Sequence, residues 1–312
     1  MLKTLYDEQK IDIKNAVMKY TLIIFCILAA YLFGIYSHSQ NLWPVGLLLE
    51  LKESTLPRLQ GRYDEFGRLV DYPNKRQTPC PAQTADTAVL LVIGQSNSAN
   101  HAEKKFITQF PGKVVNYFNG KCYQAASPLL GATGEDGEFV TPLADKLIQL
   151  GHFQSVVIIA SGIGGTPITR WQRDGDLNEM LLTVIRQVER EYKITHVIWH
   201  QGEDDYIKKT STKNYIKMFN SLLDTLREND VNAPIYLSIA TKCGANTHWD
   251  QNNPTSTGQH QLVDSRKIFL GVNTDVLVSD QDRRADRCHF AETGQLKTAD
   301  SIARSITKDS GK

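Results

Sequence analysis

The chain has 312 residues, of which 41% are hydrophobic and 22% charged, so it is long enough for one large α/β domain with a substantial core. Lysine and arginine together number 35 and aspartate and glutamate 34, which gives a formal net charge of +1. This balance, with no long run of one sign, argues against a nucleic acid as a partner.

An uncharged apolar segment spans residues 20–36 and follows a polar stretch that contains lysines. At about 17 residues it lies at the short end for a membrane span. Lysines before the segment and none directly after it indicate that the rest of the chain is exported to the periplasm or another extracytoplasmic space. Two interpretations stay open: an uncleaved anchor in the inner membrane, or a signal peptide cleaved near Ser37-His38-Ser39. We expect residues 1–39 to form this targeting region.

Residues 40–86 are expected to form a lead-in segment that packs as a strap against the main domain, which we place at residues 87–312. A short helix is predicted at 47–53. The alternation of residues 62–72 around Glu65-Phe66-Gly67 predicts a small hairpin.

From Thr87 onward, short apolar runs alternate with amphipathic stretches. The runs predict strands at 88–93, 113–118, 156–160, 196–200, 235–239 and 275–278. The amphipathic stretches predict helices at 142–150, 177–192, 214–228, 257–266 and 292–306. Repeated βαβ units imply a three-layer αβα sandwich with a mainly parallel, doubly wound sheet.

The strand at 88–93 ends in the turn Gly94-Gln95-Ser96-Asn97. Ligands of open α/β sheets bind at the carboxyl edge of the strands, where the first polar side chains after each strand collect. Ser96 is therefore a candidate nucleophile. The alternative is that these residues only build a turn, as their types commonly do.

Three more segments should reach the same edge of the sheet. Gly162–Gly165 follows the third strand, Gln201–Asp205 follows the fourth, and Asp286 and His289 lie near the end of the chain. A carboxylate three residues before a histidine is placed to hold Nδ1–H while Nε2 faces a nucleophile. Taken alone, Asp286 could equally cap a helix and His289 could be a surface side chain.

A metal site is not expected. His196 and His200 lie in one strand, about 13 Å apart by its rise per residue, so they cannot chelate an ion together. No pair of cysteines forms a C-x-x-C motif that would indicate zinc.

Together these segments resemble those of the SGNH (GDSL-type) hydrolases, and most of all the sialate O-acetylesterase and carbohydrate esterase family six branch. The resemblance runs from about residue 89 to 289 and implies an SGNH hydrolase-like fold. It also implies that Ser96 is the nucleophile, His289 the general base and Asp286 the residue that orients the base. It requires neither a metal nor an organic cofactor.

The same resemblance implies that the oxyanion hole consists of the N–H groups of Ser96 and Gly165 and the side-chain amide of Gln201. Many SGNH enzymes have Gly-x-Asn-Asp in this third segment, so Gln201 would replace the asparagine. Gly164, Glu203 and Asp205 are expected to support the site.

The function expected is that of an exported serine esterase that removes O-acetyl groups from a carbohydrate: sialic acid, a xylan-like polymer, or a capsular or cell-wall glycan. The alternatives are a carbohydrate O-acetyltransferase and a catalytically silent glycan-binding module. The presence of Ser96, Asp286 and His289 argues against the silent module. Trp171 is predicted to stack on a sugar ring and Arg170 to bind a carboxylate. Alternatively, Trp171 packs in the core and Arg170 is solvated.

Four cysteines follow Cys26, which lies in the apolar N-terminal segment. An even number outside the cytosol suggests two disulfides, with three possible connectivities, although four free thiols remain an alternative. Their positions along the chain favour the pairs Cys80–Cys122 and Cys243–Cys288. The second pair would tether the His289 loop.

Overall fold

The computed structural model describes residues 21, 25–36, 61–244 and 249–309, which fall into two compact units, Met1–Leu59 and Gln60–Lys312. In the first unit, residues 25–36 are helical. Among the described residues no helix is both long and apolar enough to cross a membrane. The segment expected to span, residues 20–36, lies partly outside the described residues, and the helix expected at 47–53 lies wholly outside them.

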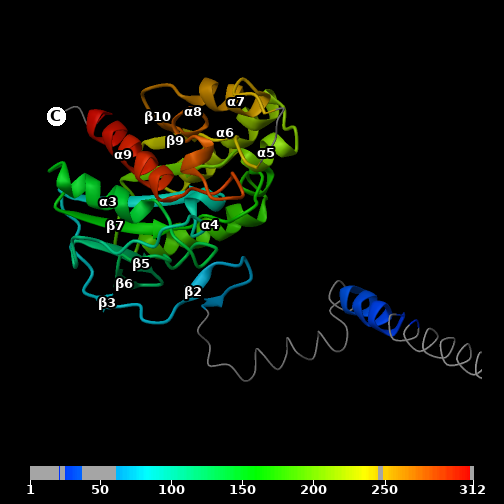
Figure 1. Ribbon diagram of the computed structural model, residues 1–312. Coiled ribbons are helices and arrows are strands. Elements are labelled where there is room, and N and C mark those ends of the chain that lie inside the picture. Colours follow the sequence, from blue (N-terminus) through cyan, green and yellow to red (C-terminus); the bar gives the residue numbers. More distant parts are fainter. Residues whose placement is uncertain (1–20, 22–24, 37–60, 245–248, 310–312) are drawn as a thin grey trace, which may run out of the picture. The chain divides into compact units, whose positions relative to one another are not determined.

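The second unit is built on an eight-stranded sheet in the order β10-β9-β8-β4-β7-β5-β6-β3 (Figure 1). The strands from β10 to β5 in this order pair in parallel, whereas β6 pairs antiparallel with β5 and β3 antiparallel with β6. Their bounds are β3 Gln77–Thr78, β4 Thr87–Gly94, β5 Val114–Phe118, β6 Lys121–Gln124, β7 Ser155–Ala160, β8 His196–His200, β9 Ile235–Ile239 and β10 Ile268–Asn273. The sheet is therefore mainly parallel, as predicted.

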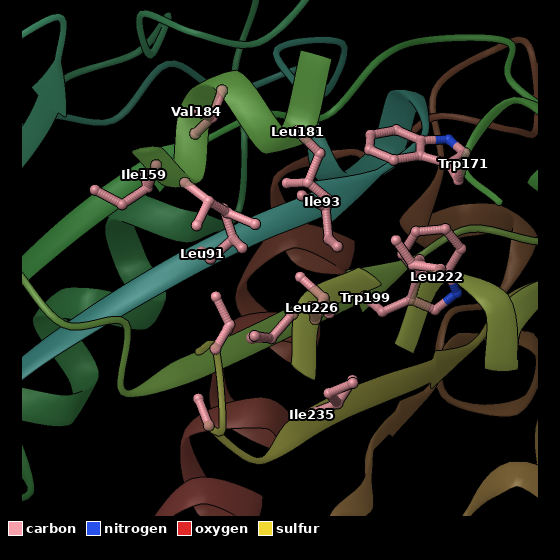
Figure 2. Packing of buried hydrophobic residues seen from close by; sticks show 14 of the residues in the cluster. Leu91, Ile93, Ile159, Trp171, Leu181, Val184, Trp199, Leu222, Leu226 and Ile235 are labelled. Carbon is pink, nitrogen blue, oxygen red and sulfur yellow. The ribbon is translucent and has the colours of Figure 1, made fainter. Parts of the chain in front are cut away.

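Helices cover both faces of this sheet (Figure 1). They include α3 Val140–Gln149, α4 Asp176–Val188, α6 Thr212–Glu228, α7 Pro254–Leu262 and α9 Glu292–Asp309. Central strand β4 is buried along its whole length. Since side chains alternate along a strand, Leu91 and Ile93 pack with residues of α4 and α6, while Leu90 and Val92 pack with residues of α3 and α9. Figure 2 shows the first of these two cores.

One predicted strand is wrong. The sequence pattern predicts a strand at residues 275–278, but Thr274–Leu277 form the short helix α8. The last strand is β10, which ends directly before this helix. The side chain of Asn273 accepts a hydrogen bond from the N–H of Val276 at 3.2 Å and so caps the helix. The apolar residues of this segment have a strand-like sequence pattern, but the capping hydrogen bond stabilises a helical turn instead.

The predicted hairpin at 62–72 forms from β1 Arg62–Tyr63 and β2 Leu69–Asp71, which pair antiparallel. Leu69 is fully buried, and its N–H donates to the carbonyl of Ala132 at 2.9 Å. The N–H of Gly131 donates in turn to the carbonyl of Leu69 at 2.8 Å. The hairpin is thus fixed to the loop between β6 and α3.

Both predicted disulfides are present. Cys80 pairs with Cys122 in β6, and Cys243, in the loop after β9, pairs with Cys288. The second disulfide therefore joins two loops at the carboxyl edge of the sheet. Cys26 is a free cysteine in the described part of the chain.

Candidate active site

The proposed nucleophile follows the end of β4. Gly94 has a φ of +128°, and a Cβ atom there would collide with the carbonyl oxygen of His200 in neighbouring β8. Only glycine therefore allows this close approach of the two strands. The N–H of Gln95 donates to the same carbonyl at 2.9 Å, and Ser96 then opens the short 3-10 helix η1, Ser96–Ser98.

The predicted acid–base pair forms in the loop before α9. His289 Nδ1 lies 2.7 Å from Asp286 Oδ2. Asp286 Oδ1 accepts the N–H groups of Cys288 at 2.8 Å and of His289 at 3.0 Å. Partial burial opposes ionisation of Asp286, but these hydrogen bonds from Cys288 and His289 outweigh it and hold the pKa of the carboxyl below its usual value.

Ser96 and His289 line one pocket of about 460 Å³. Its walls come from loops at the carboxyl ends of β4, β7, β8 and β9, from the hairpin, from the loop between β6 and α3, and from the loop before α9. The lining residues are Phe66, Gln95, Ser96, His101, Thr133, Ile163, Gly164, Gly165, Arg170, Glu203, Asp204, Ile207, Cys243, Cys288 and His289.

Two glycines of the loop after β7 line the pocket, and they differ in their hydrogen bonds. The N–H of Gly164 donates to Thr133 Oγ1 at 2.8 Å. Among the described residues, the N–H of Gly165 has no acceptor, and Gly165 has a φ of +64°. The N–H of Ser96, at the start of η1, also has no acceptor within that helix. Gly165 is thus the glycine whose N–H is available for an oxyanion.

Gln201 does not fit its predicted role as an oxyanion donor. Its side chain is fully buried and does not line the pocket. The two hydrogens of its Nε2, which it would offer to an oxyanion, already donate to the carbonyl of Thr166 at 3.1 Å and to Asp205. Gln201 instead ties the loop after β7 to the loop after β8.

Asp205 takes part in the same buried network. Its Oδ2 accepts the N–H of Ile168 at 2.7 Å and its Oδ1 accepts the hydroxyl of Thr210 at 2.6 Å. Glu203 lines the pocket, and its Oε1 accepts from Asn97 Nδ2 at 3.0 Å. Burial raises the pKa of Glu203 to about 7.

The predicted stacking role of Trp171 is wrong. Trp171 has no exposed surface, its indole N–H donates to Thr166 Oγ1 at 3.1 Å, and it packs edge-on against Trp199. Figure 2 shows it within the core on the α4 and α6 face of the sheet. The chain turns Trp171 inward after η2, Ile168–Arg170, so its face is not available to a sugar. Arg170 does line the pocket, but its guanidinium pairs with Asp176.

Sequence reasoning missed His101. Its ring stacks on that of His289 with centroids 5.5 Å apart, and its Nε2 lies 3.0 Å from Thr133 Oγ1. Burial, reinforced by His289, lowers the pKa of His101 to about 4, so the ring is neutral near pH 7. His101 lies only five residues after Ser96 in a polar run, but nothing in the spacing distinguishes it from a loop histidine.

His200 and Glu203 lie next to each other in the structure. No group of three or more His, Cys, Asp or Glu residues in the described part of the chain is arranged to hold an ion. His200 is fully buried, and burial together with Arg283 lowers its pKa to about 3. The imidazole of His200 is therefore neutral near pH 7, and its Nδ1 lies 3.8 Å from Glu203 Oε1.

The order of the mainly parallel sheet and the pocket at the carboxyl edge of its strands define an α/β domain of the SGNH hydrolase-like fold. Residues 86–308 match the family model described as carbohydrate esterase, sialic acid-specific acetylesterase. The chain belongs to this family, which supports a carbohydrate acetylesterase activity. The comparison with curated proteins gave no match.

One similar solved structure supports the fold. A protein from Arabidopsis thaliana is similar with a TM-score of 0.55 and 16% identity, over 72% of this chain and 99% of that one. NanS has a TM-score of 0.49 and 16% identity, over 72% of this chain and 98% of its own. A family 3 carbohydrate esterase from Clostridium thermocellum has a TM-score of 0.45 and 11% identity, over 71% and 96%. At 16% identity, the similarity to the Arabidopsis protein shows a shared fold alone.

Proposed function

We propose that the protein is an exported serine esterase that removes O-acetyl groups from a carbohydrate. The observation that carries the proposal is that Ser96 lines the same pocket as His289, whose imidazole is held by Asp286. Membership of the acetylesterase family supports the acetyl ester as the bond that is cleaved.

In the first step, Ser96 Oγ attacks the acetyl carbonyl carbon while His289 Nε2 takes its proton. The carboxylate of Asp286 keeps the imidazole in the required tautomer and stabilises the imidazolium that forms. The carbonyl oxygen becomes an oxyanion, which accepts hydrogen bonds from the N–H groups of Ser96 and Gly165.

In the second step, the bond between the acetyl carbon and the sugar oxygen breaks, and the sugar oxygen takes the proton from His289. The acetyl group remains on Ser96. His289 then deprotonates a water molecule that attacks this ester, and acetate leaves as Ser96 recovers its proton. Ser96, His289, Asp286 and the N–H group of Gly165 are the groups of this chain that take part, and water is the co-substrate.

The proposed substrate is an O-acetylated sugar, and the family description makes an O-acetylated sialic acid the first to test. The pocket offers both apolar side chains, Phe66 and Ile207, and polar ones. A xylan-like polymer or a capsular or cell-wall glycan meets the same chemical requirement of an acetyl ester on a ring.

Export is part of the proposal for two reasons. Disulfides persist in oxidising compartments, and this chain has two of them. The uncharged segment at residues 20–36 has the composition of a signal peptide or signal anchor.

The proposal is tested by measuring acetate release from O-acetylated sialic acids, acetylated xylan and cell-wall glycans, with p-nitrophenyl acetate as a general ester. We expect kcat/KM for at least one acetylated sugar to exceed that for p-nitrophenyl acetate. Loss of free acetate when an acceptor sugar is added would indicate acetyl transfer instead. Absence of hydrolysis with every ester would contradict an esterase function.

A further inference from the structure

One buried side chain links the proposed nucleophile to both sides of the proposed base. Asn97 directly follows Ser96 and is almost fully buried. Its Oδ1 accepts the N–H of Phe290 at 3.2 Å, and its Nδ2 donates to the carbonyl of Cys288 at 3.2 Å. Cys288 and Phe290 are the two neighbours of His289 in the chain. A single amide therefore holds the peptide groups on both sides of His289.

The other contacts of this amide make its position rigid. The second hydrogen of Nδ2 donates to Glu203 Oε1 at 3.0 Å, so every hydrogen-bonding group of the Asn97 side chain is used. Arg283 donates from Nη1 to the carbonyl of Cys288 at 2.7 Å, and its guanidinium lies 5.5 Å from the ring centroid of Phe290. These contacts hold the backbone at Cys288 and Phe290, and Asn97 connects that backbone to the turn that carries Ser96.

We infer that Asn97 is a positioning residue that fixes the distance between Ser96 Oγ and His289 Nε2 by holding the backbone on both sides of the base. The inference rests on the proposed function, in which Ser96 and His289 react together. Asp286 and Asn97 act differently. Asp286 orients the imidazole ring through Nδ1, whereas Asn97 places the backbone from which that ring projects.

Asn97→Ala should therefore lower kcat about a hundredfold with little change in KM, because a displacement of about 1 Å in a reacting group costs about that much. Asn97→Asp is a second variant of nearly the same size. It keeps the acceptor for the Phe290 N–H but places an oxygen against the Cys288 carbonyl, so its kcat should fall as well.

Asn116 provides the matched control. It is also a fully buried amide that binds backbone: its Oδ1 accepts the N–H of Leu130 at 2.8 Å, and its Nδ2 donates to the carbonyls of Leu130 and Ile158 at 3.2 and 3.3 Å. It does not line the pocket. Asn116→Ala should lower the free energy of unfolding much as Asn97→Ala does, yet keep a kcat close to that of the wild type.

The test measures kcat, KM and thermal unfolding of the full-length wild type and these variants with p-nitrophenyl acetate. It also records the ¹⁵N NMR signals of the His289 imidazole in the resting proteins. The inference predicts a loss of kcat and altered His289 signals for the Asn97 variants alone. A folded Asn97→Ala or Asn97→Asp protein that loses no more kcat than Asn116→Ala would overturn it. If the wild type hydrolyses no ester, the proposed function fails. Unchanged His289 signals in Asn97→Ala would overturn the positioning role of Asn97 independently of that result.

Discussion

His289 Nδ1 lies 2.7 Å from Asp286 Oδ2, while Asp286 Oδ1 accepts the N–H groups of Cys288 and His289. One carboxylate oxygen therefore orients the ring, and the other shapes the turn that carries it. The two functions of Asp286 can be separated because an asparagine keeps an oxygen at Oδ1 but has an NH₂ group in place of Oδ2.

Asp286→Asn should preserve the fold and lower kcat by about 10³–10⁴-fold, because an NH₂ group cannot accept the Nδ1–H of His289. The measurement is kcat with p-nitrophenyl acetate, together with the melting temperature as a control for folding. A folded variant that keeps more than about a tenth of the wild-type kcat would show that His289 does not need this partner.

The two disulfides allow a comparison of stability with activity. Their cysteines are 42 and 45 residues apart in sequence, so the chain-entropy model gives nearly the same stabilisation for each, about 4 kcal/mol. Only Cys243–Cys288 lines the pocket, next to His289. We expect the Cys243→Ser/Cys288→Ser protein to lose both stability and kcat.

The Cys80→Ser/Cys122→Ser protein is the control and should lose stability alone. Unfolding in urea measures the first effect and turnover of p-nitrophenyl acetate the second. Equal losses of kcat in the two double variants would mean that the Cys243–Cys288 disulfide has no particular effect on the base.

Glu203 should make stability depend on pH. Burial raises its pKa from 4.5 to about 7, so between these values the folded protein holds a proton that the unfolded chain has released. The stability of the folded state due to this group is therefore greatest in acid and is lost as the pH rises through about 7. Glu203→Gln carries no charge at any pH, and its Oε1 still accepts from Asn97.

We expect the unfolding free energy of Glu203→Gln, relative to that of the wild type, to increase from about pH 5 to about pH 8. Denaturant unfolding of both proteins at the two pH values measures this difference. A difference that stays constant with pH would show that the carboxyl of Glu203 titrates alike in the folded and unfolded chain.

Much of the fold was predictable because the central strands are continuous apolar runs with glycine or polar residues at their ends. β4, β7, β8 and β9 are buried along their whole length, and such runs are typical of the central strands of a parallel sheet. The sequence pattern does not reveal β10 because Gly271 interrupts its short apolar run. The apolar residues that follow it, in the turn of α8, predict a strand in its place.

The candidate site, like the fold, was predictable from the sequence only in part. Strand ends and the three-residue spacing of Asp286 and His289 indicated which residues could meet at the pocket. The direction of each side chain was not in the sequence: Trp171 and Gln201 follow strand-end loops as expected, but both turn into the core. The stacking of His101 on His289 depends on contacts between distant parts of the chain that spacing does not encode.

The central claim is that Ser96 is the nucleophile of an acetylesterase, and the most direct measurement compares the wild type with Ser96→Ala. Both proteins are mixed with p-nitrophenyl acetate, quenched within the first turnovers and analysed by peptide mass spectrometry, with melting temperatures as the control for folding. The account predicts an acetyl group on Ser96 of the wild type, and no acetylated intermediate and no turnover in an equally stable Ser96→Ala protein. Near-native turnover by Ser96→Ala, or acetylation of another residue as the intermediate, would contradict it.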